Sequence, residues 1–219
     1  MKPLSEAELK ALAYPSMVTV FWPRATNDWV VGSGFIISKN VIVTCAHSLI
    51  NGSNITMKFY GLPDSERKPA RVIAMDLEND LGLIHAETEN RPPLSLYFGW
   101  ARSIGDPVTA IGTPYKLEGH VTHGKILGLV IARNTQAILT DAPLGKSSSG
   151  GGLFNQYGQV VGVAGYGVIK RPGQYLAYSS EHVAALLQTI GTEINPPDVS
   201  TACSEWISPG KVYEEGLPP

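Results

Sequence analysis

The stretch VGSGFIISKNVIVTCAH, residues 31–47, contains two apolar runs that meet at Asn40 and end at His47. Apolar runs of roughly five to eight residues between turn-forming residues are typical of short buried strands. The same pattern extends on both sides of this stretch, from about residue 16 to about residue 178, with Gly, Pro, Asn or Asp between the runs. The sequence therefore predicts an all-β fold, either a sandwich or a barrel.

The overall composition limits the classes of protein to consider. The 219 residues suit one domain with tails, and 23 glycines and 16 prolines fit a fold rich in tight turns. A net charge of −2 provides no basic stripe for a phosphate backbone, so no nucleic acid partner is expected. We expect no membrane association and a cytoplasmic location, because no signal peptide or spanning segment is seen. Secretion is expected only if Met1 is not the native start.

The two ends of the chain differ from its centre. Ser5 and Glu8 form a capping-box pattern that predicts a short helix in an N-terminal arm, residues 1–15. Apolar spacing in SSEHVAALLQTI predicts an amphipathic helix at the end of a central domain, residues 16–190. Residues 191–219 lose this periodicity and gain proline, so we expect an extended proline-rich C-terminal tail.

Three serines directly before three glycines, in GKSSSGGGLFN at residues 145–155, suggest nucleophilic chemistry. A serine hydroxyl needs a base to accept its proton, and the base works best beside a buried carboxylate. His47 ends a strongly apolar run, and Asp80 stands directly before another, with Asp76 as the alternative acid. From the residues alone, the choice among the three serines stays open.

Six ordered blocks carry a family resemblance. They are VGSGFIISKNVIVTCAH, NDLGLI, GDPVTAIGTP, VTHGKILG, TDAPLGKSSSGGGLFNQYGQVVGV and YLAYSSEHVAALL. The chain thereby resembles the chymotrypsin-like (trypsin-like) serine proteases, and most closely their HtrA (Deg) branch, over roughly residues 16–190. The resemblance covers the protease domain alone, without the PDZ domain that often follows it. It implies two six-stranded antiparallel β-barrels, with a short N-terminal helix, a C-terminal helix and the site between the barrels.

The resemblance also implies roles for individual residues. Ser149 is the expected nucleophile, because two glycines and a small residue follow it and Asp141 lies upstream in TDA. His47 is the expected general base, Asp80 orients it, and the N–H groups of Ser147 and Ser149 form the oxyanion hole. Most relatives have glycine where this chain has Ser147, and serine resists positive φ. Either the hole is misformed at rest or the serine is tolerated without effect.

The family's substrate pocket indicates which peptide bonds would be cleaved. The residues expected to line it are Pro143, Leu144, Lys146, Ala164, Gly165, Tyr166 and Gly167. Among them no carboxylate is placed to pair with Lys or Arg, and no histidine is placed to hold Glu. We therefore expect a serine endopeptidase that prefers a small or medium apolar P1 residue, with Lys146 attracting acidic groups at the rim.

No cofactor and no metal are expected. His120 and His123 stand three apart in a strand-like run, so their side chains point to opposite faces. Cys45 lies within an apolar run, which favours a buried, inert thiol. The expected partner is a protein or peptide substrate, and a regulatory partner protein is compatible with the sequence although no residue argues for one. The alternative function is a latent or inactive protease-fold module that binds peptides under the control of a partner.

Overall fold

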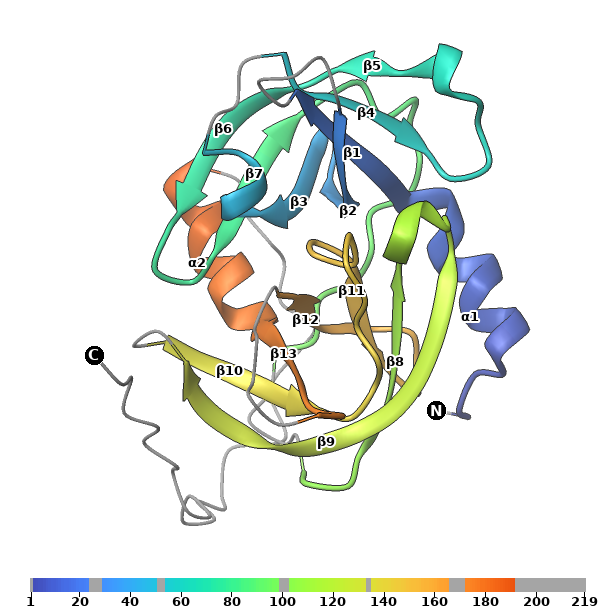
Figure 1. Ribbon diagram of the computed structural model, residues 1–219, viewed down its shortest axis with the longest axis vertical. Helices are drawn as coiled ribbons and strands as arrows, with labels where there is room; N and C mark the ends of the chain where they lie inside the picture. The colour runs from blue at the N-terminus through green and yellow to red at the C-terminus, as the bar shows by residue number, and fades with distance from the viewer. Residues whose placement is uncertain are drawn as a thin grey trace.

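The structure is a computed structural model that describes residues 2–23, 29–50, 54–98, 103–132, 135–165 and 172–191. It contains two twisted antiparallel sheets, one above the other in Figure 1, with helices at their junction. Two of the expected pocket residues, Tyr166 and Gly167, and nearly all of the expected tail lie outside the described residues.

The first sheet contains seven strands in the order β5-β4-β1-β2-β3-β7-β6. Their bounds are β1 Met17–Pro23, β2 Trp29–Ser38, β3 Val41–Cys45, β4 Thr56–Phe59, β5 Lys68–Pro69, β6 Arg71–Asp76 and β7 Leu81–His85. The sheet is open, so the prediction of two closed six-stranded barrels is wrong for this half. The two edge strands are joined in the chain through Ala70: β5 pairs with β4 and β6 pairs with β7, but no ladder joins β5 to β6, so the sheet stays open.

The second sheet is a closed barrel, as predicted, with the strand order β10-β13-β12-β11-β8-β9. Its strands are β8 Pro107–Gly112, β9 His120–Ala132, β10 Thr135–Thr140, β11 Gly152–Asn155, β12 Val160–Ala164 and β13 Tyr175–Ser179. The long strand β9 closes the barrel, because residues 120–125 pair with β8 and residues 126–132 pair with β10. One curved strand thus serves two neighbours, as Figure 1 shows.

The continuous apolar run of β3 is explained by burial on both faces of the strand. Val43 and Cys45 point into a core shared by both sheets, whereas Ile42 points into a second core within the first sheet. Alternate residues of a strand face opposite sides, so a strand covered on both sides is buried at every position and mostly apolar, and the buried Thr44 hydroxyl donates to the Ser33 carbonyl. The shared core includes Phe35 from the first sheet and Phe154 from the barrel.

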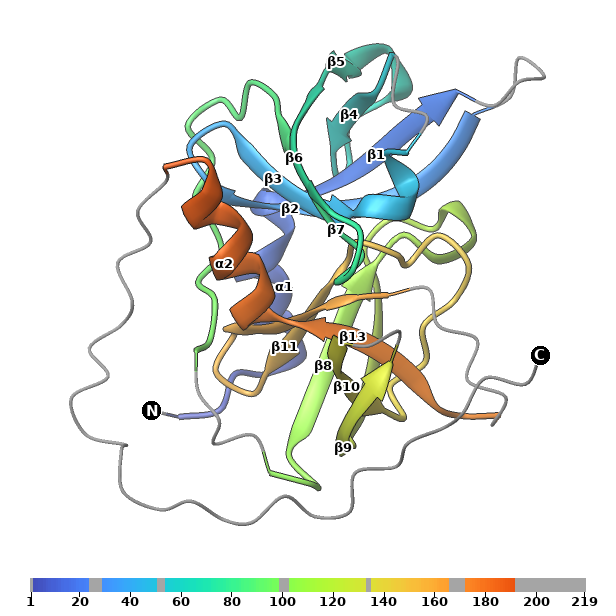
Figure 2. The same cartoon turned by 90° about the vertical axis from the view of Figure 1, so that its left-hand side faces the viewer.

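Both expected helices are present. Helix α1, Glu6–Ala13, starts at the capping box of Ser5 and Glu8. Helix α2, Ser180–Thr189, packs across the junction of the two sheets (Figure 2) and buries Val183, Leu186 and Leu187. None of the helices in the described ranges has the length and apolar character that crossing a membrane requires.

Polar side chains also join the two sheets. Lys58 of β4 is largely buried, and its ammonium group contacts the Glu118 carboxylate, which precedes β9, at 2.7 Å. Near this pair, Thr113 donates a hydrogen bond from its hydroxyl to the Tyr60 hydroxyl at 3.0 Å. Burial raises the pKa of the Tyr60 phenol, and the hydrogen bond with Thr113 opposes that rise only in part.

We predict that Tyr60 makes the protein sensitive to alkali. Below pH 10 both the folded and unfolded phenol are protonated, but above it only the unfolded state releases the proton. A raised folded pKa therefore gives stability that is lost as pH rises. Between pH 9 and pH 11 the free energy of unfolding should fall by about 1 kcal/mol more in the unchanged protein than in Tyr60→Phe. Urea unfolding of both proteins measures this difference, and an equal fall would contradict the prediction.

Candidate active site

Strand register brings His47 and Asp80 together. His47 lies two residues beyond Cys45, the last residue of β3, and Asp80 directly precedes Leu81, the first residue of β7. The two strands are antiparallel, and Cys45 pairs with Leu81. The end of one strand therefore lies beside the start of the next, which places both side chains at the same edge of the sheet.

The contact between His47 and Asp80 is close and largely shielded from water. The Nδ1 atom of His47 lies 2.8 Å from Oδ2 and 3.0 Å from Oδ1 of Asp80, and the backbone N–H of His47 donates to Oδ1 at 2.8 Å. Asp80 is only 3% exposed, whereas the His47 side chain is 33% exposed. When Nδ1 donates to the carboxylate, Nε2 is the basic nitrogen of the ring.

The neighbouring acid, Asp76, makes different contacts. Its carboxylate accepts hydrogen bonds from the backbone N–H of Asn79 at 2.9 Å and from the Asn79 side chain at 2.6 Å. These bonds hold the turn between β6 and β7. Asp80 ends that turn with a left-handed φ of 51°, a conformation that Asp and Asn adopt more readily than most residues. Of the two acids, the one beside His47 is Asp80.

The serine loop connects β10 to β11 and packs against the first sheet. Ser149 is 7% exposed, and its carbonyl accepts a hydrogen bond from the N–H of Ser33 in β2 at 2.9 Å. Gly150 has a φ of 88°, and a Cβ atom there would lie 2.0 Å from the Ser33 carbonyl oxygen and 2.5 Å from the Thr44 hydroxyl. Only glycine allows this approach. Thr44 belongs to β3, the strand that leads to His47.

Both expected oxyanion donors lie in this loop. Ser147 adopts a left-handed φ of 73°, so the serine takes up a conformation that is costly for a residue with a Cβ atom. Its carbonyl accepts a hydrogen bond from the Ser33 hydroxyl at 3.0 Å. Within the described ranges, neither the N–H of Ser147 nor that of Ser149 is bonded to another residue. These two N–H groups are thus candidates for oxyanion donors.

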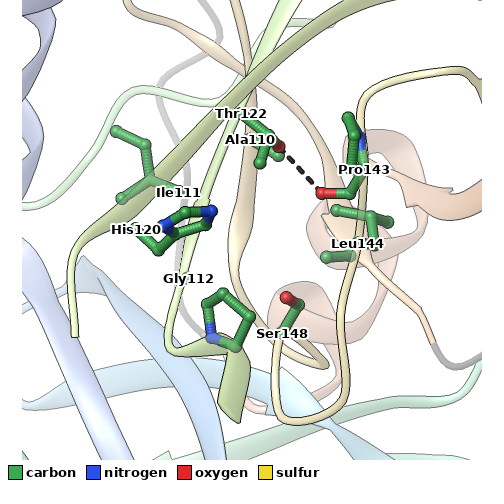
Figure 3. A pocket seen from close by; sticks show the side chains of 10 residues that line it. Ala110, Ile111, Gly112, His120, Thr122, Pro143, Leu144 and Ser148 are labelled. Atoms are coloured by element: carbon green, nitrogen blue, oxygen red, sulfur yellow. Dashed lines mark hydrogen bonds between the residues drawn. The ribbon is translucent and has the colours of Figure 1, made fainter. Parts of the chain in front are cut away.

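Three of the expected pocket residues, Pro143, Leu144 and Ala164, line one small cavity of about 10 Å³, which is room for about one water molecule. Figure 3 shows the Ser148 side chain and the His120 ring at the same cavity. No histidine was expected near these residues. His120 and Thr122 come from β9, and nothing in the sequence indicated that β9 runs beside this loop.

Lys146 and Gly165 are the other expected pocket residues that the structure describes. Lys146 is exposed, and its carbonyl accepts a hydrogen bond from the N–H of Tyr115 at 2.7 Å. Gly165 follows β12, where a Cβ atom would lie 2.6 Å from the Tyr178 ring. His120 and His123 diverge, as expected from strand geometry: His120 faces the cavity, whereas the His123 ring contacts Glu6 at 2.8 Å.

One cluster in the described part of the chain offers three types of metal-ligating atom. The thiol of Cys45, the His47 ring and the Asp80 carboxylate lie within 4.8 Å of one another. The Cys45 thiol is buried and donates to the Ala164 carbonyl at 3.3 Å, and the other two groups are bonded to each other. This bonding suits the positioning of an imidazole for proton transfer.

Comparison with known proteins identifies the class. Residues 32–163, more than half of the chain, match the profile of the trypsin-like peptidase domain. The chain belongs to this family, and its resemblance to the HtrA branch is confirmed by the relatives that follow.

Two relatives share the name probable periplasmic serine endoprotease DegP-like. The protein from Chlamydia pneumoniae is 35% identical over 144 residues, which cover 63% of this chain and 29% of the relative. The protein from Halomonas elongata is 32% identical over 154 residues, which cover 68% of this chain and 32% of the relative. The chain thus spans about a third or less of the length of these relatives.

Solved structures show the same fold. The serine endoprotease from Yersinia pestis matches with a TM-score of 0.74 and 26% identity, over 87% of this chain and 68% of that chain. A protease from M. tuberculosis in its active form matches with a TM-score of 0.74 and 23% identity, over 90% of this chain and 91% of that chain. The second match supports the fold alone.

The expected cytoplasmic location is wrong. The similar proteins from Chlamydia pneumoniae and Halomonas elongata are named periplasmic, not cytoplasmic. The expectation was based on the absence of a signal-like segment after Met1, and the first residues of this sequence do not decide what precedes the domain.

We predict that Asp80→Asn slows acylation of Ser149 by about 10³- to 10⁴-fold, because an amide does not stabilise a positively charged imidazole. Asparagine tolerates the left-handed backbone and retains an oxygen for the His47 N–H, so the fold should persist. The rate of labelling by a fluorophosphonate measures the effect. Asp76→Asn is the matched control and should label within about threefold of the unchanged rate. An equal loss in both variants would contradict the role of Asp80.

Proposed function

We propose that the chain is a serine endopeptidase of the HtrA/DegP type that cleaves proteins or peptides with Ser149 as its nucleophile. The observation that carries the proposal is the close, buried contact between His47 and Asp80 at the sheet edge against which the Ser149 loop packs. Within the 219 residues we assign residues 16–190 to the protease domain, residues 1–15 to an arm and residues 191–219 to a tail.

The proposed reaction has two halves. The Ser149 oxygen attacks the peptide carbonyl while His47 accepts its proton, and Asp80 stabilises the imidazolium. The negative charge that forms on the carbonyl oxygen is held by the N–H groups of Ser147 and Ser149. His47 then donates the proton to the leaving amine as the C–N bond breaks. Water hydrolyses the acyl-enzyme by the same steps in reverse order.

The conformation of the serine loop supports activity over the alternative of a latent peptide-binding module. Ser147 has the left-handed backbone, and its N–H and that of Ser149 have no acceptor among the described residues. A misformed hole would be expected to turn at least one of these donors toward the protein. The names of the relatives also support a periplasmic location.

The apolar side chains of Pro143, Leu144 and Ala164 support a small or medium apolar P1 residue. A charged side chain against these groups would lose water without gaining a partner. The exposed Lys146 would attract acidic residues at the rim.

Labelling with a fluorophosphonate tests the nucleophile. We expect one adduct per chain, mapped by mass spectrometry to Ser149 and absent from Ser149→Ala, because only this serine is expected to have its proton accepted by His47. Ser16→Ala removes another buried hydroxyl, one that donates to the Pro92 carbonyl and not to the serine loop, and should label at the unchanged rate. An adduct at Ser147 or Ser148, or none at all, would refute the proposed nucleophile.

Peptide substrates that differ only at P1 test the specificity. With Val or Ala at P1 we expect kcat/KM at least about tenfold higher than with Lys or Arg, because no carboxylate among the assigned pocket residues can pair with a cation. A Glu substrate is the informative comparison, since His120 lies at the cavity. Preference for Glu over Val would overturn the apolar assignment while leaving the nucleophile in place.

A further inference from the structure

At the junction of the two sheets, the N–H, carbonyl and hydroxyl groups of Ser33 all form hydrogen bonds. Ser33 lies in β2 and is 0% exposed. Its N–H donates to the Ser149 carbonyl at 2.9 Å, and its hydroxyl donates to the Ser147 carbonyl at 3.0 Å. Its hydroxyl oxygen also accepts from the Thr113 N–H at 2.9 Å, and its carbonyl accepts from the Thr44 hydroxyl at 2.8 Å.

The surroundings fix the direction of the Ser33 hydroxyl. Its oxygen accepts from the Thr113 N–H, its hydroxyl also interacts with that of Tyr60, and its proton is donated to the Ser147 carbonyl. Thr113 is itself bonded through its side chain to Tyr60. A Cβ atom at Gly112 would lie 3.2 Å from the Ser33 oxygen and 3.4 Å from Ser148 Cα, so the hydroxyl sits in a closely packed space.

Two contacts hold the two peptide planes on either side of Ser147. The plane before it contains the Lys146 carbonyl, which accepts from the Tyr115 N–H at 2.7 Å. In a trans peptide the N–H points opposite to the carbonyl, so this bond directs the Ser147 N–H away from Tyr115. The plane after it contains the Ser147 carbonyl, which Ser33 holds. The φ of 73° is a rotation between these two planes.

We propose that Ser33 is a positioning residue that keeps Ser147 in the left-handed conformation and so keeps its N–H available as an oxyanion donor. The inference rests on the proposed function. A left-handed backbone is disfavoured roughly five- to thirtyfold for a residue with a Cβ atom, whereas glycine adopts it readily. A buried hydrogen bond shifts an equilibrium by up to about tenfold, which is comparable. The Ser33 bond thus offsets the conformational cost of having serine at position 147.

A double-mutant cycle with Ser33→Ala and Ser147→Gly tests this coupling. Ser33→Ala alone should lower kcat and the labelling rate of Ser149 about tenfold, with KM changed less than twofold, because a smaller fraction of molecules has the donor in place. Ser147→Gly alone should raise the rate no more than about threefold. With glycine at position 147, Ser33→Ala should lower kcat and the labelling rate of Ser149 no more than about twofold, since glycine adopts the left-handed conformation without the Ser33 hydrogen bond.

A structural role for Ser33 would give a different result. If Ser33 were only structural, Ser33→Ala would lower the free energy of unfolding and would slow the reaction by the same factor with serine or glycine at position 147. Equal factors in the two backgrounds would overturn the proposal. Ser16→Ala is the control for removal of a buried serine hydroxyl that donates to a carbonyl, and it should change stability without changing kcat.

Hydrogen exchange provides a readout that needs no catalysis. The Tyr115 N–H is bonded to the Lys146 carbonyl, so its exchange reports opening of the loop. Ser33→Ala should speed this exchange about tenfold with serine at position 147 and no more than about twofold with glycine. If Ser149 is never labelled but the exchange is coupled, the proposed function fails and the positioning role stands. If Ser149 is labelled but neither readout is coupled, the positioning role fails alone.

Discussion

The close approach of the Gly150 backbone to β2 is the constraint on which the site depends. At this point a loop of the closed barrel meets a strand of the open sheet, and a Cβ atom would lie 2.0 Å from the Ser33 carbonyl oxygen. The hydrogen bond from the Ser33 N–H to the Ser149 carbonyl fixes the spacing at 2.9 Å. A larger residue at position 150 would separate the two halves that carry the reacting groups.

Burial of Asp80 is the second constraint, and it ties the stability of the sheet to the chemistry. A carboxylate that is 3% exposed is tolerated only when hydrogen bonds replace its lost water. The backbone N–H and the ring of His47 supply those bonds. The bonds that compensate for the burial of Asp80 also set the orientation of the His47 imidazole. Pairing of β3 with β7 therefore positions the proposed base as the sheet folds.

The sequence pattern predicted much of the fold but not how each sheet ends. Apolar runs between turn residues are local and located most strands, and a capping box and helical apolar spacing, which are also local, located both helices. Closure depends on long-range pairing: the continuous strand β9 pairs with both β8 and β10, whereas the segment that pairs with β4 and β7 is divided at Ala70 into β5 and β6. The expectation of a closed barrel in this half came from the resemblance, and the first sheet is open.

The sequence by itself determined the types of reacting group and their order along the chain, because an apolar run ending in His47, an acid before Leu81 and a serine before glycines are local patterns. Tertiary structure alone decided which acid lies beside His47, since that follows from the pairing of Cys45 with Leu81. It also decided that Ser147 is left-handed and that Ser33, 114 residues away in the chain, bonds to its carbonyl. Contacts between distant segments depend on how the sheets pack, and no local pattern in the sequence encodes that packing.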